Sequence, residues 1–600
     1  MKVPTIVPLA LLAVLLTAAG SAFAHEETTL ADPPTRSFDR IARAVERGDL
    51  SPEDGHFYKI LAIRDPSRLP AAFLVEGAPP LKCATPIFED AREATEERPR
   101  GDLGRSDLLR VRPTLPAYID TQHFRIHYST SGGNAIHGWP NTSYRDAVAA
   151  ACETSWSFYH AQNDWEIPPS DGGAGGGSGL IDCYVDALNG VYGYAQSESP
   201  SGEYPGSYTA FFVIDNDYDG FGYPDRTDPM KVTVAHEYHH VVQMGLRAGT
   251  SWWMENTSTF MEDEVYDEIN DNYNYLNCYF GAPYRRLTYT NGCFEYACFI
   301  WPTYLKENWS HAVVRDVWNE YATTGNLYDV FDLVLAPYGF TLDTAVAEWA
   351  NWNVFTGNRA DDEHYIEGGP YNRYVNYDNS ISTFPQYAVH PSPAKEPEGL
   401  GANFTKLVPE FGSSDNVIEV TYRAPSCSYE SVIWFSRKLT GQQECEQYPV
   451  EVDDTGTAGI ELDRWDETEW MFMTVPMKRA CGALARDFEF DVVTSQEATD
   501  VEDRIRPARV IRLDQNQPNP FNPTTRIRYA LGEPLPVRLE IFDASGRHVR
   551  TLVDGLQSAG EHAIAWFGED DRGRAVPTGL YFYSLRAGEE TRVRKMLLVE

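Results

Sequence analysis

The sequence predicts an α+β chain of several domains: a mixed β-sheet with helices, followed by two all-β, immunoglobulin-like sandwich domains. With 600 residues, the chain is too long for a single core. Strict alternation over His123–Tyr128 predicts a half-buried strand, and helical patterns dominate from Met230 to about Trp352. After residue 400 the pattern changes to short alternating runs such as Val417–Val420, which are typical of β-sandwiches.

Composition narrows the class of protein and its partners. The chain is 42% hydrophobic and 23% charged, which excludes disordered, collagen-like and multi-span membrane proteins. It has 50 basic and 88 acidic residues, a net charge of −38. Nucleic acids and anionic membranes need a basic surface, so we expect neither as a partner.

Residues 1–24 are typical of a signal peptide. Lys2 supplies a positive start, Leu9–Ala19 is apolar, and Ala22–Ala24 fits the cleavage pattern before His25. The alternative is a retained anchor, but the run is short for a span of about 30 Å. No later stretch approaches about 18 uncharged apolar residues, so we expect export and no membrane span in the mature chain.

Shifts in composition suggest the remaining boundaries. We expect a polar pro-segment or accessory region at 25–115, a domain of strands and helices at 116–365, a linker at 366–399, a β-sandwich at 400–495, a charged linker at 496–513 and a final β domain at 514–600.

The motif that carries chemistry is His236-Glu237-Tyr238-His239-His240, or HExxH. Two histidines four residues apart on a helix project from one face, so both imidazoles can bind one zinc ion. Glu237 can then accept a proton from a water molecule that the zinc activates. The alternative is a histidine-rich surface helix, which the apolar flanks disfavour.

The third zinc ligand must come from a second helix, because no metzincin continuation follows the motif. That helix is predicted to begin near Ser251. After a short connection, Glu255 faces the level of His240, so we expect it as the ligand. Glu262 lies two turns further on the same face, which suits a role in orienting a ligand histidine.

These two tracts, HEYHH and Trp252–Glu262 (WWMENTSTFME), resemble the gluzincin metallopeptidases, the group of thermolysin and the aminopeptidase N type enzymes. The resemblance implies a thermolysin/aminopeptidase-like zinc-peptidase fold and cleavage of polypeptides. The gap from His240 to Glu255 is shorter than usual there, and the exopeptidase signature GxMEN is absent. We therefore expect an endopeptidase.

Enzymes of this group use a Tyr or His to stabilise the oxyanion. Tyr296 is the candidate by position, and a core aromatic is the equal alternative.

Cys83, in the pro-like segment, has two interpretations. We favour half of an ordinary disulfide, since export permits disulfides. The alternative is a thiolate that occupies the open position of the zinc and holds the enzyme latent.

An acidic loop precedes the HExxH helix. Asp215, Asp217 and Asp219 have the DxDxDG spacing of calcium loops, but Arg226 at the twelfth position excludes an EF-hand. A Ca²⁺ site and a solvated acidic turn both remain open. The acidity of this part of the chain predicts an electronegative cleft that discourages acidic substrates.

The last segment contains NQPNPFNP at Asn516–Pro523 and ends in a basic, apolar run at Arg594–Val599. It resembles the type A C-terminal sorting domain of the type IX secretion pathway, related to the Ig-like domain of flagellar hook-capping proteins. The resemblance implies the type IX machinery as a partner and a secreted or surface-attached protein of a Gram-negative bacterium. The alternative is a carbohydrate-binding sandwich, but Trp566 is the only tryptophan of the segment.

The leading hypothesis is thus a secreted zinc endopeptidase. A non-catalytic surface adhesin on a metallopeptidase-like scaffold and a zinc hydrolase of non-peptide substrates are the alternatives. The intact set of His236, Glu237 and His240 favours the first, since a scaffold has no need of the base.

Overall fold

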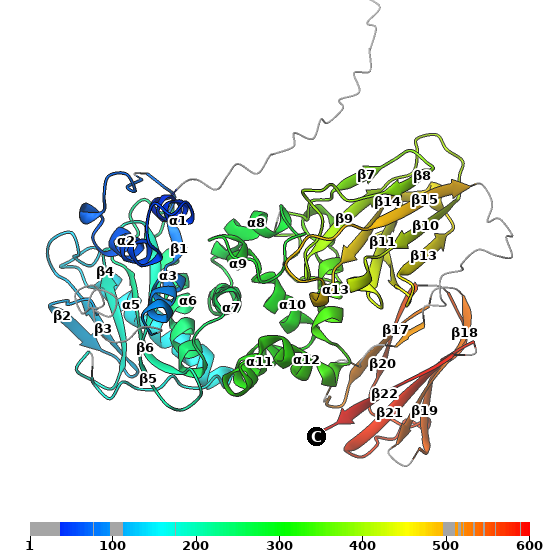
Figure 1. Ribbon diagram of the computed structural model, residues 1–600. Helices are drawn as coiled ribbons and strands as arrows, with labels where there is room; N and C mark the ends of the chain where they lie inside the picture. The colour runs from blue at the N-terminus through cyan, green and yellow to red at the C-terminus, as the bar shows by residue number, and fades with distance from the viewer. Residues whose placement is uncertain are drawn as a thin grey trace, which may run out of the picture.

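A computed structural model describes residues 36–75, 77–96, 112–174, 176–371, 373–495 and, with short gaps, 511–599. The signal peptide predicted at 1–24 and most of the linker predicted at 496–513 lie outside the described residues. Figure 1 shows a sheet covered by helices, a group of further helices, and two β parts. The mixed α+β class and the β-rich second half are confirmed.

The first part is built on a six-stranded mixed sheet of order β1-β5-β6-β4-β3-β2. The strands are β1 (Leu81–Cys83), β2 (Ala117–Asp120), β3 (Phe124–Tyr128), β4 (Ile181–Asp186), β5 (Val191–Pro200) and β6 (Tyr208–Asp215). The neighbours β3, β4 and β6 run parallel, while β5 is antiparallel to β6. At the edge, β1 pairs parallel with β5.

The described part of the region predicted at 25–115 as a pro-segment or accessory region packs on this sheet. Its helices are α1 (Ser37–Glu46), α2 (Pro52–Arg64) and α3 (Thr85–Glu96). Ile60 and Phe88 form one apolar cluster with Tyr194 and Phe211 of the sheet. A segment that packs in this way is part of the domain that it covers.

Helices α5 (Ser143–Trp156) and α6 (Thr227–Leu246) lie over the sheet, and α7 (Ser251–Val265) packs on α6 (Figure 1). Gly245 lies inside α6, which ends at Leu246. A Cβ added at Gly245 would lie 2.7 Å from Cδ of Pro169. This glycine therefore permits close packing instead of ending the helix.

Further helices extend the core toward the β-sandwich. They are α8 (Leu276–Phe280), α9 (Phe294–Ala297), α10 (Ile300–Asn308), α11 (His311–Thr324), α12 (Leu327–Leu335) and α13 (Leu342–Trp352). Phe404 and Phe472 of the sandwich share the main apolar core with these helices. Among the described residues, no single helix is both long and apolar enough to cross a membrane. The two segments 327–338 and 342–352, which are bent against each other, reach that length and apolar character only when taken together.

The sandwich has two sheets, β13-β10-β15-β8 and β12-β11-β14-β9-β7. Its strands are β7 (Asn379–Ile381), β8 (Gln386–Val389), β9 (Ala402–Leu407), β10 (Val417–Arg423), β11 (Val432–Leu439), β12 (Cys445–Glu451), β13 (Thr457–Leu462), β14 (Thr468–Pro476) and β15 (Glu489–Ser495). The linker predicted at 366–399 is therefore wrong over β7 and β8, because Ile381 and Phe384 pack on the sandwich core.

The last domain is a second sandwich, with sheets β16-β17-β20 and β19-β18-β21-β22. Its strands are β16 (Ile511–Leu513), β17 (Thr525–Leu531), β18 (Leu535–Asp543), β19 (His548–Gln557), β20 (Gly560–Trp566), β21 (Gly579–Ala587) and β22 (Glu590–Leu598). Trp566 is 0% exposed and donates its indole N–H to the carbonyl of Glu569. It is a core residue and offers no platform for a sugar.

Candidate metal centre

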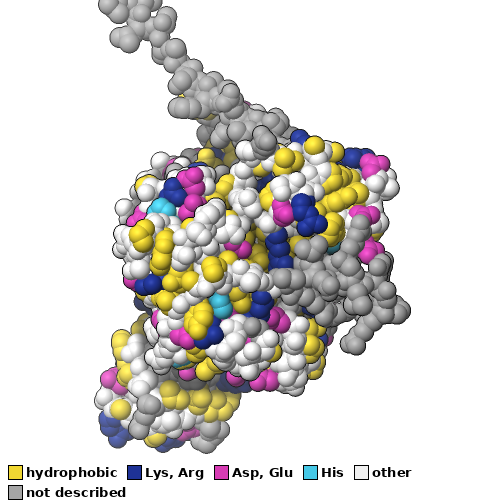
Figure 2. Space-filling model, turned by 90° about the vertical axis from the view of Figure 1, so that its left-hand side faces the viewer, with side chains coloured by type: hydrophobic (Ala, Val, Ile, Leu, Met, Phe, Trp, Pro, Cys, Tyr) yellow, Lys and Arg dark blue, Asp and Glu magenta, His cyan; other side chains and the backbone are white. Residues whose placement is uncertain are grey.

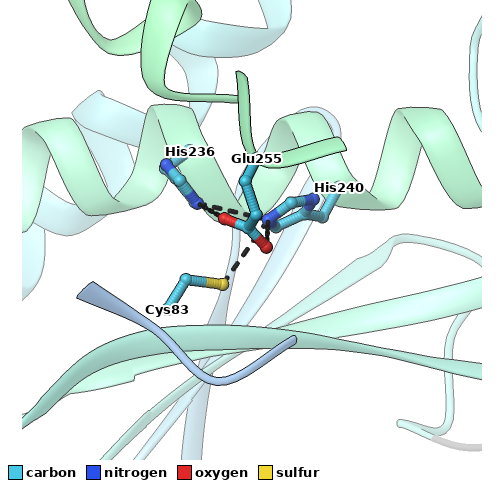
Figure 3. Close-up of side chains that lie close together, drawn as sticks. All are labelled: Cys83, His236, His240 and Glu255. Atoms are coloured by element: carbon cyan, nitrogen blue, oxygen red, sulfur yellow. Dashed lines mark hydrogen bonds and ion pairs between the residues drawn. The ribbon is translucent and has the colours of Figure 1, made fainter. Parts of the chain in front are cut away.

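Three side chains predicted as metal ligands converge between α6 and α7 (Figure 3). Nε2 of His236 lies 3.2 Å from Nε2 of His240 and 3.1 Å from Oε2 of Glu255. Nε2 of His240 lies 3.3 Å from Oε1 of Glu255. The two histidines come from adjacent turns of α6, and Glu255 comes from the first turns of α7, just after the connection 247–250.

The outer nitrogens of both histidines have acceptors. Nδ1 of His236 lies 2.7 Å from Oε1 of Glu262, and Nδ1 of His240 lies 2.7 Å from Oε1 of Gln243. The Gln243 amide is fixed, because its Nε2 donates to the Met254 carbonyl at 3.1 Å. Each Nδ1 can therefore carry the proton, which leaves each Nε2 lone pair directed at the common centre.

The role of Gln243 was not predicted from the sequence. Its spacing could have predicted it, because a residue three positions after His240 on a helix lies on the same face and can contact its imidazole. Glu262 contacts the His236 imidazole, as the spacing in the sequence suggests. It accepts from Nδ1 of His236 and is not one of the candidate ligands.

A fourth side chain joins this set. Sγ of Cys83, from β1, lies 3.4 Å from Nε2 of His240, and the ligand atoms of Cys83, His236, His240 and Glu255 all lie within 4.8 Å of one another (Figure 3). The disulfide favoured for Cys83 is wrong: the thiol is free and buried, whereas Cys278–Cys293 and Cys427–Cys481 form disulfides.

These donors fit a transition-metal ion. Tetrahedral zinc with bonds of about 2.0–2.3 Å separates its ligand atoms by roughly 3.3–3.8 Å, close to the contacts above. Oε1 of Glu237 is buried without a hydrogen bond. Burial of such oxygens is costly unless a cation or donor compensates it. The chemistry of two imidazoles, a carboxylate and a thiol suits zinc among other metals.

The charged side chains of the site shift one another's pKa values. Burial alone would lower the pKa of His236, but the carboxylates of Glu255 and Glu262 raise it to about 9. Burial would raise the pKa of Glu255, but His240 and His236 lower it to about 2. Glu255 is thus a carboxylate throughout the physiological range, as a metal ligand must be.

Glu237 lies beside the ligand cluster, against β5. Burial raises its pKa, although His236 and His240 act in the opposite direction. Its Oε2 accepts from the Thr85 hydroxyl at 3.2 Å and lies 3.5 Å from Sγ of Cys83. The position suits a general base for a molecule bound at the centre.

Tyr296 of α9 also reaches the site. Its hydroxyl donates to the carbonyl oxygen of Cys83 at 3.3 Å, and its ring centroid lies 6.3 Å from that of His236. The Tyr296 hydroxyl is thus a hydrogen-bond donor beside Cys83. Only 1% of the Tyr296 surface is exposed, so it also packs in the core.

The acidic loop before α6 does not gather its carboxylates around one point. Oδ1 of Asp215 accepts from the backbone N–H groups of Asp217 and Tyr218, which shapes the turn. Asp219 pairs with Arg226 at 2.6 Å. Among the described residues, Asp215, Asp217 and Asp219 do not form a group with the close oxygen atoms that Ca²⁺ requires.

The electronegative cleft expected around the site is closed. His236, His240, Glu255 and Cys83 are each at most 2% exposed. In Figure 2, the outer face carries acidic, basic and apolar side chains scattered among one another. Two acidic side chains, Glu262 and Asp271, are buried where they contact Lys82, whereas others, such as Asp219 and Asp267, are exposed.

Comparison with known proteins identifies only the last domain. Residues 519–590 match the family model of the FlgD Ig-like domain. This confirms an Ig-like β region at the C-terminal end. No curated protein sequence gives a significant match.

Comparison of structures finds small regions of similarity. PorZ, a surface component of the type IX secretion system of Porphyromonas gingivalis, is 16% identical over 19% of this chain and 14% of its own, with a TM-score of 0.12. Dimeric latent PorU of the same organism is 15% identical over 38% of this chain and 19% of its own, with a TM-score of 0.15. The aligned parts span less than a fifth of either relative.

Proposed function

We propose that this protein is a zinc-dependent endopeptidase that is secreted. The observation that carries the proposal is the convergence of His236, His240 and Glu255 with Glu237 beside them. The resemblance of the same tracts to the gluzincins supports zinc as the metal and a peptide bond as the substrate. A scaffold without catalysis has no need of a buried carboxylate base at this place.

In this proposal, bound zinc supplies Lewis-acid chemistry and lowers the pKa of a water molecule. Glu237 accepts the proton of the attacking water and returns it to the leaving amine. Tyr296 donates its hydroxyl proton in a hydrogen bond to the substrate carbonyl oxygen as negative charge develops there. Glu262 and Gln243 hold the protons of the two imidazoles on Nδ1.

The test compares wild type and Glu237→Gln, each also in the Cys83→Ala background because Cys83 lies among the ligands. Zinc content and casein hydrolysis are measured on all four chains. We expect one zinc per chain in each, and at least about a hundredfold loss of hydrolysis with Glu237→Gln. Stoichiometric zinc without hydrolysis in any chain favours the adhesin or a zinc hydrolase of non-peptide substrates, and absence of zinc contradicts the site.

The C-terminal domain is, in the same proposal, the sorting signal for type IX secretion. The match to the FlgD Ig-like domain and the NQPNPFNP tract support it. In a bacterium with this pathway, the full chain should reach the medium or cell surface, and a chain ending at residue 495 should stay in the periplasm. Equal export of both chains would contradict this role.

A further inference from the structure

Residues 81–85 bind along β5 as an added strand. The Leu81 N–H donates to the Gly190 carbonyl at 2.8 Å, and the Ala84 N–H donates to the Gly193 carbonyl at 3.0 Å. The Thr85 hydroxyl accepts from the Ala195 N–H at 2.8 Å. Addition of a strand to a sheet edge is a common way for a protein to bind an extended peptide.

This pairing delivers Cys83 to the metal centre. In register, Cys83 stands beside Gly193, and its Sγ lies between Nε2 of His240 at 3.4 Å and Oε2 of Glu237 at 3.5 Å. The thiol therefore lies at the fourth coordination position, which two imidazoles and one carboxylate leave open. A second observation points to a ligand here: Oε1 of Glu237 is buried without a hydrogen bond.

The main chain of the segment also occupies the reaction site. The Tyr296 hydroxyl, assigned above to a substrate carbonyl, donates to the carbonyl of Cys83. The Thr85 hydroxyl donates to Glu237, the assigned base. Both groups proposed for catalysis are thus engaged by the chain itself.

Lys82 anchors the segment on its other side. Its Nζ lies 2.7 Å from Oε2 of Glu262, contacts Asp271, and sits 4.8 Å from the Tyr192 ring centroid. The side chain is 1% exposed. Loss of one partner from a fully buried ion pair is costly, so Lys82 opposes departure of the segment.

We propose that residues 81–85 are a built-in inhibitory segment, in which Cys83 is the fourth ligand of the metal and Lys82 is the anchor. The proposal rests on the proposed metal and goes beyond the proposed peptidase activity. Ligation of the metal would require the Cys83 thiol to give its proton to solvent, and the thiol would take up a proton again when the segment leaves. Hydrolysis then requires that the segment leave.

The first experiment needs no variant and no activity. X-ray absorption at the zinc edge of the full chain should show one sulfur neighbour at about 2.3 Å together with nitrogen and oxygen neighbours. A zinc shell with nitrogen and oxygen only would overturn the proposal.

The second experiment uses cobalt-substituted full chains. Wild type should show thiolate-to-cobalt charge-transfer absorption, and Cys83→Ser and Cys83→Ala should lose it while binding one cobalt each. Cys445→Ser, which removes another free thiol, is the control and should keep it. Circular dichroism establishes that each variant is folded. Persistence of the absorption in folded Cys83→Ser would overturn the assignment.

The last measurement addresses inhibition. Casein hydrolysis by Cys83→Ala should exceed that of wild type by at least about tenfold. Casein hydrolysis by Lys82→Met should also exceed that of wild type. Equal hydrolysis by wild type and Cys83→Ala would overturn the inhibitory role. A sulfur ligand with no hydrolysis in any chain would instead support Cys83 ligation and contradict the peptidase.

Discussion

Nδ1 of His236 and Nζ of Lys82 each lie 2.7 Å from an oxygen of the same Glu262 carboxylate. One carboxylate oxygen contacts His236 of the metal centre, and the other contacts Lys82 of residues 81–85, the segment that packs against that centre. Orientation of the imidazole and retention of residues 81–85 are therefore linked through a single group.

Glu262→Gln should weaken zinc binding by about 10–100-fold, because the amide is a poorer acceptor for Nδ1 of His236. Competition with a chromophoric chelator measures the affinity. Glu268→Gln, at an exposed position beyond the end of α7, is the control. Equal affinities of Glu262→Gln and wild type would show that Glu262 does not support the metal.

Gln243→Met should lower zinc affinity by about tenfold or more, since Nδ1 of His240 then keeps only the hydroxyl of Ser258, at 3.2 Å. The substitution also leaves the Met254 carbonyl without the amide donor, which should cost about 1–3 kcal/mol of unfolding free energy. Chelator competition and thermal unfolding of the same samples separate the two effects. Lower stability with unchanged zinc affinity would assign Gln243 to the core alone.

The helical part of the site follows from the sequence because its geometry is local. Spacing along one helix brings His236 and His240 together, and the short connection to α7 limits where Glu255 can lie. The position of Cys83 does not follow, because β1 and β5 pair in parallel without a turn that joins them. Likewise β7 and β8 are too short to show a clear alternation.

Gly193→Ala should destabilise the first domain by about 1–3 kcal/mol. An added Cβ would lie 2.7 Å from Cγ of Glu237 and 2.9 Å from the Val213 carbonyl oxygen, so helix and strand would have to separate. Thermal unfolding measures the change. Gly555→Ala is the matched control, because a Cβ at that strand glycine has nothing within 4 Å. Equal melting temperatures for the two variants would contradict the close contact.

Asp263→Asn should stabilise the protein at alkaline pH. Burial and the carboxylates of Glu367 and Glu264 raise the pKa of Asp263 to about 8. A raised folded-state pKa means that stability falls as pH rises from about 4 toward 8, where the unfolded chain is ionised and the folded one is not. The asparagine variant lacks this fall.

The melting temperatures of Asp263→Asn and wild type should therefore diverge with pH. Between pH 5 and 8, wild type should lose about 1.4 kcal/mol per pH unit, roughly 4 kcal/mol in all, so by pH 8.5 the advantage of the variant should have grown by roughly 8–16 °C. A difference that stays constant over this range would show that Asp263 ionises normally.

The parallel pairing of β1 with β5 also bears on solubility. Without β1, strand β5 would present a free row of N–H and C=O groups at the border of the sheet. Such borders promote association between chains, and proteins commonly cover them. The first segment of this chain thus shields the sheet from aggregation for as long as it stays bound, and its loss would expose a strand to which any extended polypeptide can add.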